Sequence, residues 1–236
     1  MTTNEAMRSP EVDRSNGGLR RRLADNGLSV AVFTAFFLFI VLQSIFGWQV
    51  RNEELAEYGR AADSYLNYLT TGHFAEAVFE NWESEFLQMG AYVLLTAYLV
   101  QRGSAESKKP DEKDRPEDDP QHATDESPRP SREHGLTQLL YRNSLAIVLF
   151  AFFALSFLSH VLGGTAEHNE QQALRGQPPV GTLEFLASSD FWFQSMQNWQ
   201  SEFLAVGALI VLSIFLRQHG SPESKPVTAP HRQTGE

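Results

Sequence analysis

Four polar side chains stand within or beside long apolar stretches of this sequence, where polar groups are energetically costly. They are Glu85, Glu202, Gln43 and His160. An ionisable residue near the bilayer core usually has a function or a specific partner. A histidine beside a carboxylate titrates near physiological pH, so this cluster could handle protons, a cation or a small polar ligand.

Helix spacing and chain direction predict which of the four residues are neighbours. Gln43 and His160 come a few residues before the ends of their apolar helices, and Glu85 and Glu202 come one turn into the helices that follow. Helices joined by a short loop run antiparallel. We therefore expect Gln43 at the depth of Glu85, and His160 at the depth of Glu202.

A structural interpretation explains the same residues with fewer assumptions. Asn81 and Asn198 can N-cap the second and fourth helices. A glutamate in the first turn is then stabilised by the helix dipole, and a glutamine or histidine supplies a hydrogen bond between helices. Both interpretations require similar residues at equivalent positions in the two halves of the chain. The match between the halves therefore does not distinguish them, and both stay open.

Other chemistry has no sequence support. The chain has no cysteine, and its histidines and glutamates show no metal-ligand spacing. Nucleophile elbows, phosphate loops and dinucleotide fingerprints are missing. We expect no catalytic, cofactor-binding or metal-binding residue and a non-enzymatic protein. The formal net charge of -10 also disfavours nucleic acid as a partner.

The elements that position the cluster are four apolar blocks separated by polar sequence. A bilayer core needs about 20 mostly apolar residues in a helix, and tryptophans at the headgroup level extend the shorter blocks. The sequence predicts four transmembrane helices, built around Leu28–Trp48, Phe86–Val100, Leu145–Leu162 and Phe203–Leu216.

The second half of the chain repeats the first without a gap. Asn81-Trp82-Glu83-Ser84-Glu85-Phe86-Leu87 recurs as Asn198-Trp199-Gln200-Ser201-Glu202-Phe203-Leu204, an offset of 117 residues, and Gln101–Lys108 recurs as Gln218–Lys225. The predicted fold is an all-α membrane protein with four transmembrane helices, arranged as two tandem parallel-repeat two-helix units. Such units are related by an axis along the membrane normal.

Short polar segments predict where these helices begin and end. The first helix can continue to Tyr58 and stop at Gly59, and Gly176 is the counterpart of that glycine. Thr70-Thr71 and Ser188-Ser189 are candidate N-caps for short interfacial helices on the outer side, expected at His73–Phe79 and Phe191–Met196.

Domain limits and orientation follow from charge and composition. Repeat units are expected at 18–108 and 135–225, with a disordered N-terminal tail (1–17), cytoplasmic linker (109–134) and C-terminal tail (226–236). Lysine and arginine are concentrated before the first apolar block, between the second and third blocks and after the fourth, whereas the loops inside the units carry only Arg51, Arg60 and Arg175. Both termini are therefore predicted to be cytoplasmic.

The paired Asn-Trp-x-Ser-Glu-Phe-Leu and Gly-Ser-x-Glu-Ser-Lys segments resemble an uncharacterised family of bacterial four-span membrane proteins, a domain-of-unknown-function family. The resemblance implies a bacterial inner membrane and brings no activity. We expect a structural or accessory protein. The alternative is a small transporter or channel for protons, a cation or a small polar solute. The bilayer is the expected partner, and the small residues Ser201, Ala205 and Ala208 suit packing within the bundle or in a homo-oligomer.

Overall fold

The computed structural model describes residues 19–111 and 118–235, and all regular elements in those ranges are helical. The expected N-terminal tail and part of the linker lie outside the described residues. The chain divides into two compact units, residues 1–65 and 66–236. The first holds α1 (Leu19–Asp25) and α2 (Gly27–Glu57), and α3 (Tyr65–Tyr68) crosses the boundary. The second holds α4 (Gly72–Tyr98), η2 (Pro120–His122), α5 (Arg129–Arg132), α6 (Leu136–Arg142), α7 (Ser144–Leu174), α8 (Thr182–Leu186) and α9 (Ser189–Phe215).

In the first unit, α2 ends where the sequence predicted, and the chain folds back along it. Gly59 has φ 65°, the left-handed conformation that glycine adopts without strain at a helix end. Asn52 then fixes the returning loop, because its Oδ1 accepts the Asp63 N–H at 2.7 Å and its Nδ2 donates to the Asp63 carbonyl at 3.2 Å. Trp48 Nε1 donates to the same carbonyl at 2.7 Å.

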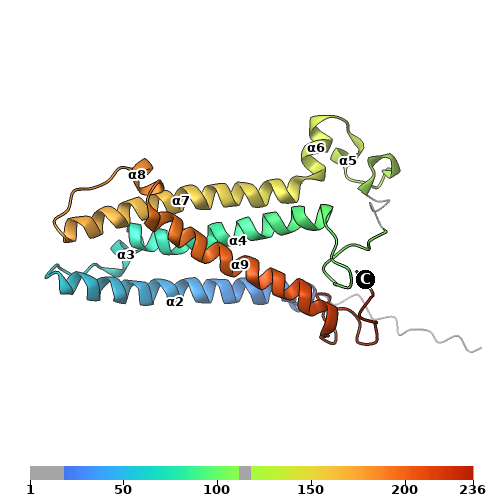
Figure 1. Cartoon of the computed structure of the whole chain (residues 1–236), viewed down its shortest axis with the longest axis horizontal. Helices are drawn as coiled ribbons and strands as arrows, with labels where there is room; N and C mark the ends of the chain where they lie inside the picture. Colours follow the sequence, from blue (N-terminus) through green and yellow to red (C-terminus); the bar gives the residue numbers. More distant parts are fainter. Residues whose placement is uncertain (1–18, 112–117, 236) are drawn as a thin grey trace, which may run out of the picture. The chain divides into compact units, whose positions relative to one another are not determined.

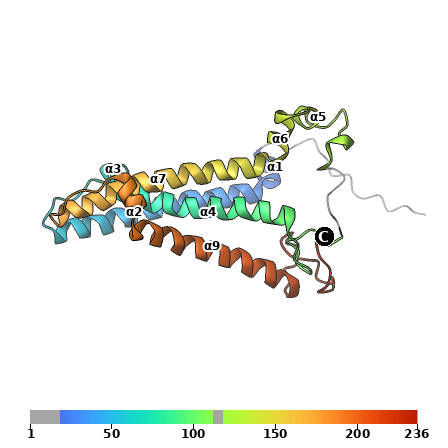
Figure 2. The ribbon, with the colours of Figure 1, turned by 45° about the horizontal axis from the view of Figure 1, so that its top comes forward.

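In the second unit, α4 packs along α7, and α9 crosses α4 (Figure 1; Figure 2). Two glycines allow α4 and α7 to approach closely. A Cβ on Gly72 would lie 2.5 Å from the backbone nitrogen of Glu167, and a Cβ on Gly163 would lie 2.9 Å from that of Glu76. The start of α4 therefore meets the later turns of α7, and the two helices run antiparallel.

The helices α4 and α9 begin earlier than the sequence predicted. Their N-caps are Thr71 and Ser188, whose hydroxyls accept backbone N–H groups at 3.3 and 3.2 Å. The prediction that Asn81 is an N-cap is wrong. Asn81 is the tenth residue of α4, and its side chain donates to the Ala77 carbonyl of the same helix. The expected short interfacial helices are the first turns of α4 and α9, because no residue after either cap breaks the helix.

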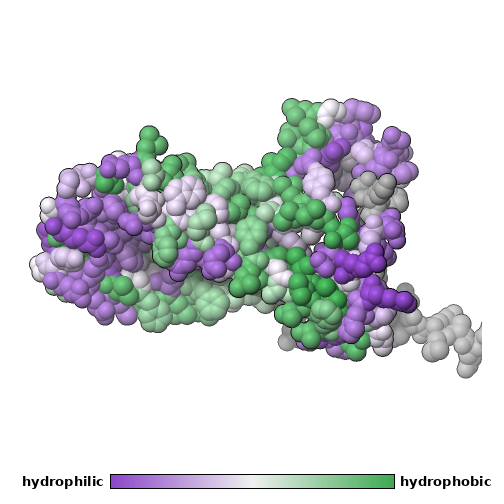
Figure 3. All heavy atoms as spheres, viewed as in Figure 1, coloured by the Kyte–Doolittle hydropathy of each residue, from purple (hydrophilic) through white to green (hydrophobic). Residues whose placement is uncertain are grey.

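Three described helices, rather than four, are long and apolar enough to cross a membrane: α2, α7 and α9. The fourth predicted span falls in α4, whose first half carries Glu76, Glu80, Glu83 and Glu85. Figure 3 shows apolar side chains gathered over the middle of the helices and hydrophilic ones over the loops.

The compact units do not coincide with the predicted repeat units. The boundary falls after residue 65, because α4 packs against α7 and α9. Helix bounds nevertheless recur at the predicted offset: α7 begins and ends 117 residues after α2, and α9 does so after α4. Asn169 fixes its loop as Asn52 does, exchanging hydrogen bonds of 2.7 and 3.0 Å with Val180.

The described parts of the linker and C-terminal tail contain short helices and turns, and the disorder predicted for both segments stays a prediction. The linker contains η2 and α5. In the tail, the Lys225 ammonium donates to the carbonyls of Pro230, His231 and Gln233 at 2.9–3.4 Å.

Candidate functional site

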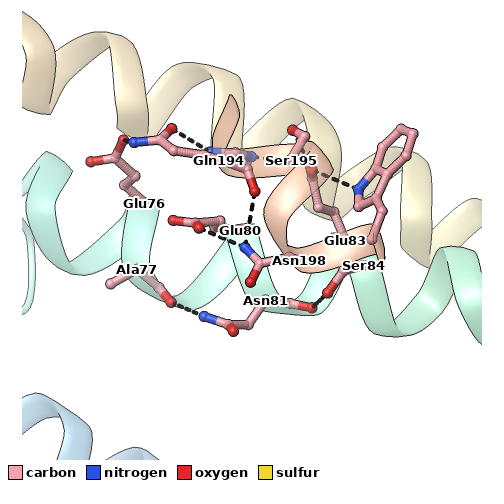
Figure 4. Close-up of polar contacts among 11 residues, drawn as sticks. Glu76, Ala77, Glu80, Asn81, Glu83, Ser84, Gln194, Ser195 and Asn198 are labelled. Carbon is pink, nitrogen blue, oxygen red and sulfur yellow. Dashed lines mark hydrogen bonds and ion pairs between the residues drawn. The ribbon is translucent and has the colours of Figure 1, made fainter. Parts of the chain in front are cut away.

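Three glutamates of α4 face the beginning of α9 (Figure 4). Glu76, Glu80 and Glu83 are separated by four and three residues, so they share one face of the helix. Polar groups of α9 meet them there. Gln194 donates from Nε2 to Glu76 Oε1 at 3.0 Å, and Asn198 donates from Nδ2 to Glu80 Oε1.

At the centre of the site, Glu83 of α4 pairs with His160 of α7. Glu83 Oε2 lies 3.0 Å from His160 Nδ1, and neither side chain is exposed. The other carboxylate oxygen accepts the Ser195 hydroxyl at 2.8 Å and the Trp199 indole N–H at 3.2 Å. An indole nitrogen can only donate, so Glu83 Oε1 accepts both of these hydrogen bonds from α9.

Gln194 connects this pair to Glu76. Its Nε2 donates to Glu76, which leaves its Oε1 to accept from His160 Nε2 at 3.4 Å. His160 Nε2 is then the donor toward Gln194, and His160 Nδ1 pairs with Glu83 at 3.0 Å. The polar contacts Glu83–His160–Gln194–Glu76 therefore connect α4, α7 and α9.

Aromatic residues close the other side of the histidine. The His160 ring lies 4.8 Å, centroid to centroid, from the ring of Phe191, which is fully buried. Phe191 belongs to an apolar cluster with Val161 and Phe185, and Phe157 packs against that cluster. Because these groups exclude water, loss of either partner of the ion pair would leave a buried charge.

A cavity of about 360 Å³ lies beside Glu76, at the end of these polar contacts that is farther from Glu83. Burial, followed by the charge of Glu167, raises the pKa of Glu76 to about 7, although the bond from Gln194 opposes the shift. Glu76 precedes the apolar half of α4. The cavity is lined by Glu76, Glu167, His168, Gln171, Phe185, Asp190, Phe193, Gln194 and Gln197.

Of the four residues singled out in the sequence, only His160 lies in this site. It pairs with Glu83 in place of the expected Glu202. Glu85 is exposed on α4, and its carboxylate is close enough to that of Glu202 for the two charges to repel. Gln43 belongs to the first compact unit, so its pairing with Glu85 stays a prediction.

The sequence analysis did not identify Glu83 as the acidic partner of His160, nor Ser195 and Trp199 as donors to Glu83. The available signal was the spacing of Glu76, Glu80 and Glu83, which marks one helix face. It was missed because the helix was expected to begin at Asn81, which placed the first two glutamates outside it. Ser195 was likewise assigned to a separate interfacial helix.

The arrangement can hold three helices in register and can exchange protons at Glu76. Among the described residues, no group of three or more histidine, aspartate or glutamate side chains could hold a metal ion.

Three long apolar helices and a polar site enclosed between packed helices define a helical membrane-embedded protein. The chain belongs to a family described as a domain of unknown function (DUF6766), whose model matches residues 19–236. The predicted resemblance to an uncharacterised family is thus confirmed. No curated protein and no solved structure matches the sequence.

Proposed function

We propose that this protein is a non-enzymatic, structural or accessory protein of a bacterial inner membrane. The observation that carries the proposal is the enclosed Glu83–His160 pair, in which both charges are directed at neighbouring helices. Ser195 and Trp199 bring α9 to the same carboxylate. A buried ion pair between α4 and α7, bonded also to donors of α9, suits a fixed scaffold better than a moving part.

We propose that α4 crosses the membrane beside α7 and α9, with both termini and the linker in the cytoplasm. The glutamates of α4 lower its apolarity, but Glu83 is paired inside the protein and the last turns, from Ala91 to Tyr98, are apolar. The arginine and lysine asymmetry sets the direction. Two tandem two-helix units then enter in the same orientation.

Cysteine labelling tests this topology, because the chain has no native cysteine. Exposed Ser64 and Gln177, each changed to cysteine, should react with an impermeant thiol reagent in intact cells. A cysteine at exposed Glu126 should react only after permeabilisation. Labelling of Ser64→Cys and Glu126→Cys from the same side would show that α4 does not cross.

The proposed repeat has support in the second unit. A pseudo-two-fold axis along the membrane normal brings equivalent residues of the two copies together where they lie near it. Two glutamate pairs with the 117-residue offset interact in this way, Glu85 with Glu202 and Glu106 with Glu223. The bilayer is the proposed partner, with a homo-oligomer using the exposed small residues Ser201, Ala205 and Ala208 of α9.

A second candidate function is transport of protons, a cation or a small polar solute. The hydrogen bonds from Glu76 through Gln194 to His160, which pairs with the buried Glu83, favour it. Glu76 lines the cavity, and its pKa of about 7 allows proton exchange at physiological pH. In this function Gln194 would couple the cavity to His160.

A flux assay in liposomes separates the two functions. A scaffold is expected to give the same proton or cation flux as empty vesicles. A transporter would exceed that level and lose the excess in Glu76→Gln. The matched control is Glu57→Gln, an exposed change at the end of α2 that should leave any flux unaltered. A reproducible wild-type flux that only Glu76→Gln abolishes would refute the scaffold.

A further inference from the structure

A short helix precedes the first long helix of each proposed repeat unit. These short helices are α1 before α2 and α6 before α7, and the bounds of α6 follow those of α1 by 117 residues. One asparagine joins the short helix to the long one in each case. Asn26 Nδ2 donates to the Arg22 carbonyl at 2.8 Å, and Asn143 Nδ2 donates to the Leu139 carbonyl at 2.8 Å. The junction before the long apolar helix is therefore the same in both copies.

Asn143 changes the direction of the chain between α6 and α7. Its φ of -111° and ψ of 10° are not helical, and its carbonyl accepts the Ile147 N–H at 3.0 Å in the first turn of α7. Because one residue caps both the end of α6 and the start of α7, the two helices join without a flexible spacer. Figure 1 shows that α6 leaves the axis of α7 at a steep angle.

The leucines of α6 form one face of that helix. At about 100° per residue, Leu136, Leu139 and Leu140 fall on one side, and Gln138 falls on the opposite side. The three leucines are exposed, with relative accessibilities of 69%, 50% and 48%. Gln138 Nε2 donates to the Ser131 carbonyl of α5 at 3.2 Å. The side of α6 that packs against the protein is thus its polar side, and its apolar side is left open.

The open leucine face continues onto the surface of α7. Directly after the junction α7 exposes Leu145 and Val148, and this helix is long and apolar enough to cross a membrane. Exposed Arg142 stands at the junction, and exposed Arg129 stands on the neighbouring α5. In the headgroup layer of a bilayer, leucine contacts acyl chains and a guanidinium group contacts phosphates. An apolar face that adjoins a membrane-crossing helix and is bordered by arginine matches that layer.

We propose that α6 lies in the plane of the membrane, in the headgroup layer at the surface where α7 begins. Its leucine face contacts the acyl chains, and Arg142 contacts lipid phosphates. This inference rests on the proposal that α7 crosses the membrane, and in the proposed topology the surface is the cytoplasmic one. α6 then fixes the depth of α7, since a helix joined at a steep angle cannot move into the bilayer without burying its polar side.

Spin labels on single cysteines test this placement in the full chain, reconstituted in vesicles of phosphatidylethanolamine and phosphatidylglycerol. The chain has no native cysteine, so each label reports one position. Collisions with oxygen, which concentrates among acyl chains, are compared with collisions with a water-soluble nickel chelate. Labels at Leu139→Cys and Leu140→Cys should collide more with oxygen than with nickel. The matched control on the same helix is exposed Thr137→Cys, whose label should collide more with nickel.

A label at Leu155→Cys, exposed in the middle of α7, tests the membrane crossing separately. Oxygen-dominated collisions there, together with nickel-dominated collisions at Leu139→Cys and Leu140→Cys, would overturn the proposal for α6 and leave the crossing intact. Labels on the leucine face that collide with neither reagent would also overturn it, because they would show a protein partner in place of lipid. Nickel-dominated collisions at Leu155→Cys would refute the crossing and the placement of α6 with it.

Discussion

Changing Glu83 to glutamine is expected to destabilise the second unit by about 3–5 kcal/mol, the cost of breaking a buried ion pair. The carboxylate accepts from Ser195 and Trp199 at one oxygen and pairs with His160 at the other. A glutamine turns one of those oxygens into a donor and leaves a buried imidazole without its counter-charge. The measurement is the midpoint of thermal unfolding in detergent.

Two further variants test whether the lost ion pair causes the lower stability of Glu83→Gln. The double change Glu83→Leu with His160→Leu removes both charges, so it should be less damaging than Glu83→Gln alone. Gln200, the exposed residue at the repeat position of Glu83, is the matched control. Gln200→Ala should stay within about 0.5 kcal/mol of wild type, as surface changes do. A Glu83→Gln protein as stable as Gln200→Ala would contradict the account of the site.

Changing Gly72 to alanine is expected to have the second large effect, about 1–3 kcal/mol or more, because the added methyl overpacks a closed contact. Its Cβ would lie 2.5 Å from the Glu167 nitrogen and 2.7 Å from the Gly163 carbonyl oxygen. Both neighbours are backbone atoms of α7, so neither can rotate away. The helices must separate at this point, and a lower unfolding midpoint would report it.

Gly207 supplies the control for this change. It lies within α9, and a Cβ there would meet no atom within 4 Å. Gly207→Ala should therefore be neutral or stabilise the helix by up to about 1 kcal/mol, the difference in helix propensity. If Gly72→Ala and Gly207→Ala behave alike, the close approach of α4 to α7 is not tight in solution.

Local features were predictable from the sequence because local chemistry determines them. The apolar runs indicated α2, α7 and α9, and the glycine stops placed the ends of α2 and α7. The hydroxyl caps Thr71 and Ser188 were also predicted. Each of these signals depends on residues within a few positions of one another.

The centre of the site was not predictable in this way, because its partners come from distant parts of the chain. His160 was found as a polar residue in an apolar helix, but its carboxylate could not be chosen from sequence. Glu83 and Glu85 are two residues apart, and the rotation of α4 about its axis decides which one faces α7. That rotation depends on Gly72 and Gly163, whose contact is tertiary.

The loops after α4 and α9 were predictable from the sequence only in part. The loop Gln101–Lys108 and the loop Gln218–Lys225 match at the 117-residue offset, and their hydrogen bonds are alike. The bonds from Thr234 and Gly235 to the first loop could not be foreseen, because hydroxyl and backbone groups carry no periodic pattern.

The division of the ion pair between α4 and α7 also bears on how the protein is made. Glu83 leaves the ribosome 77 residues before His160, an interval of roughly 4–15 s at ordinary rates of synthesis. During that time the carboxylate has no imidazole to pair with, and α4 lacks the apolarity of the helices on either side of it in the chain. In the proposed topology, α4, the helix that holds most of the site, therefore takes its place in the bilayer only after later parts of the nascent chain are made.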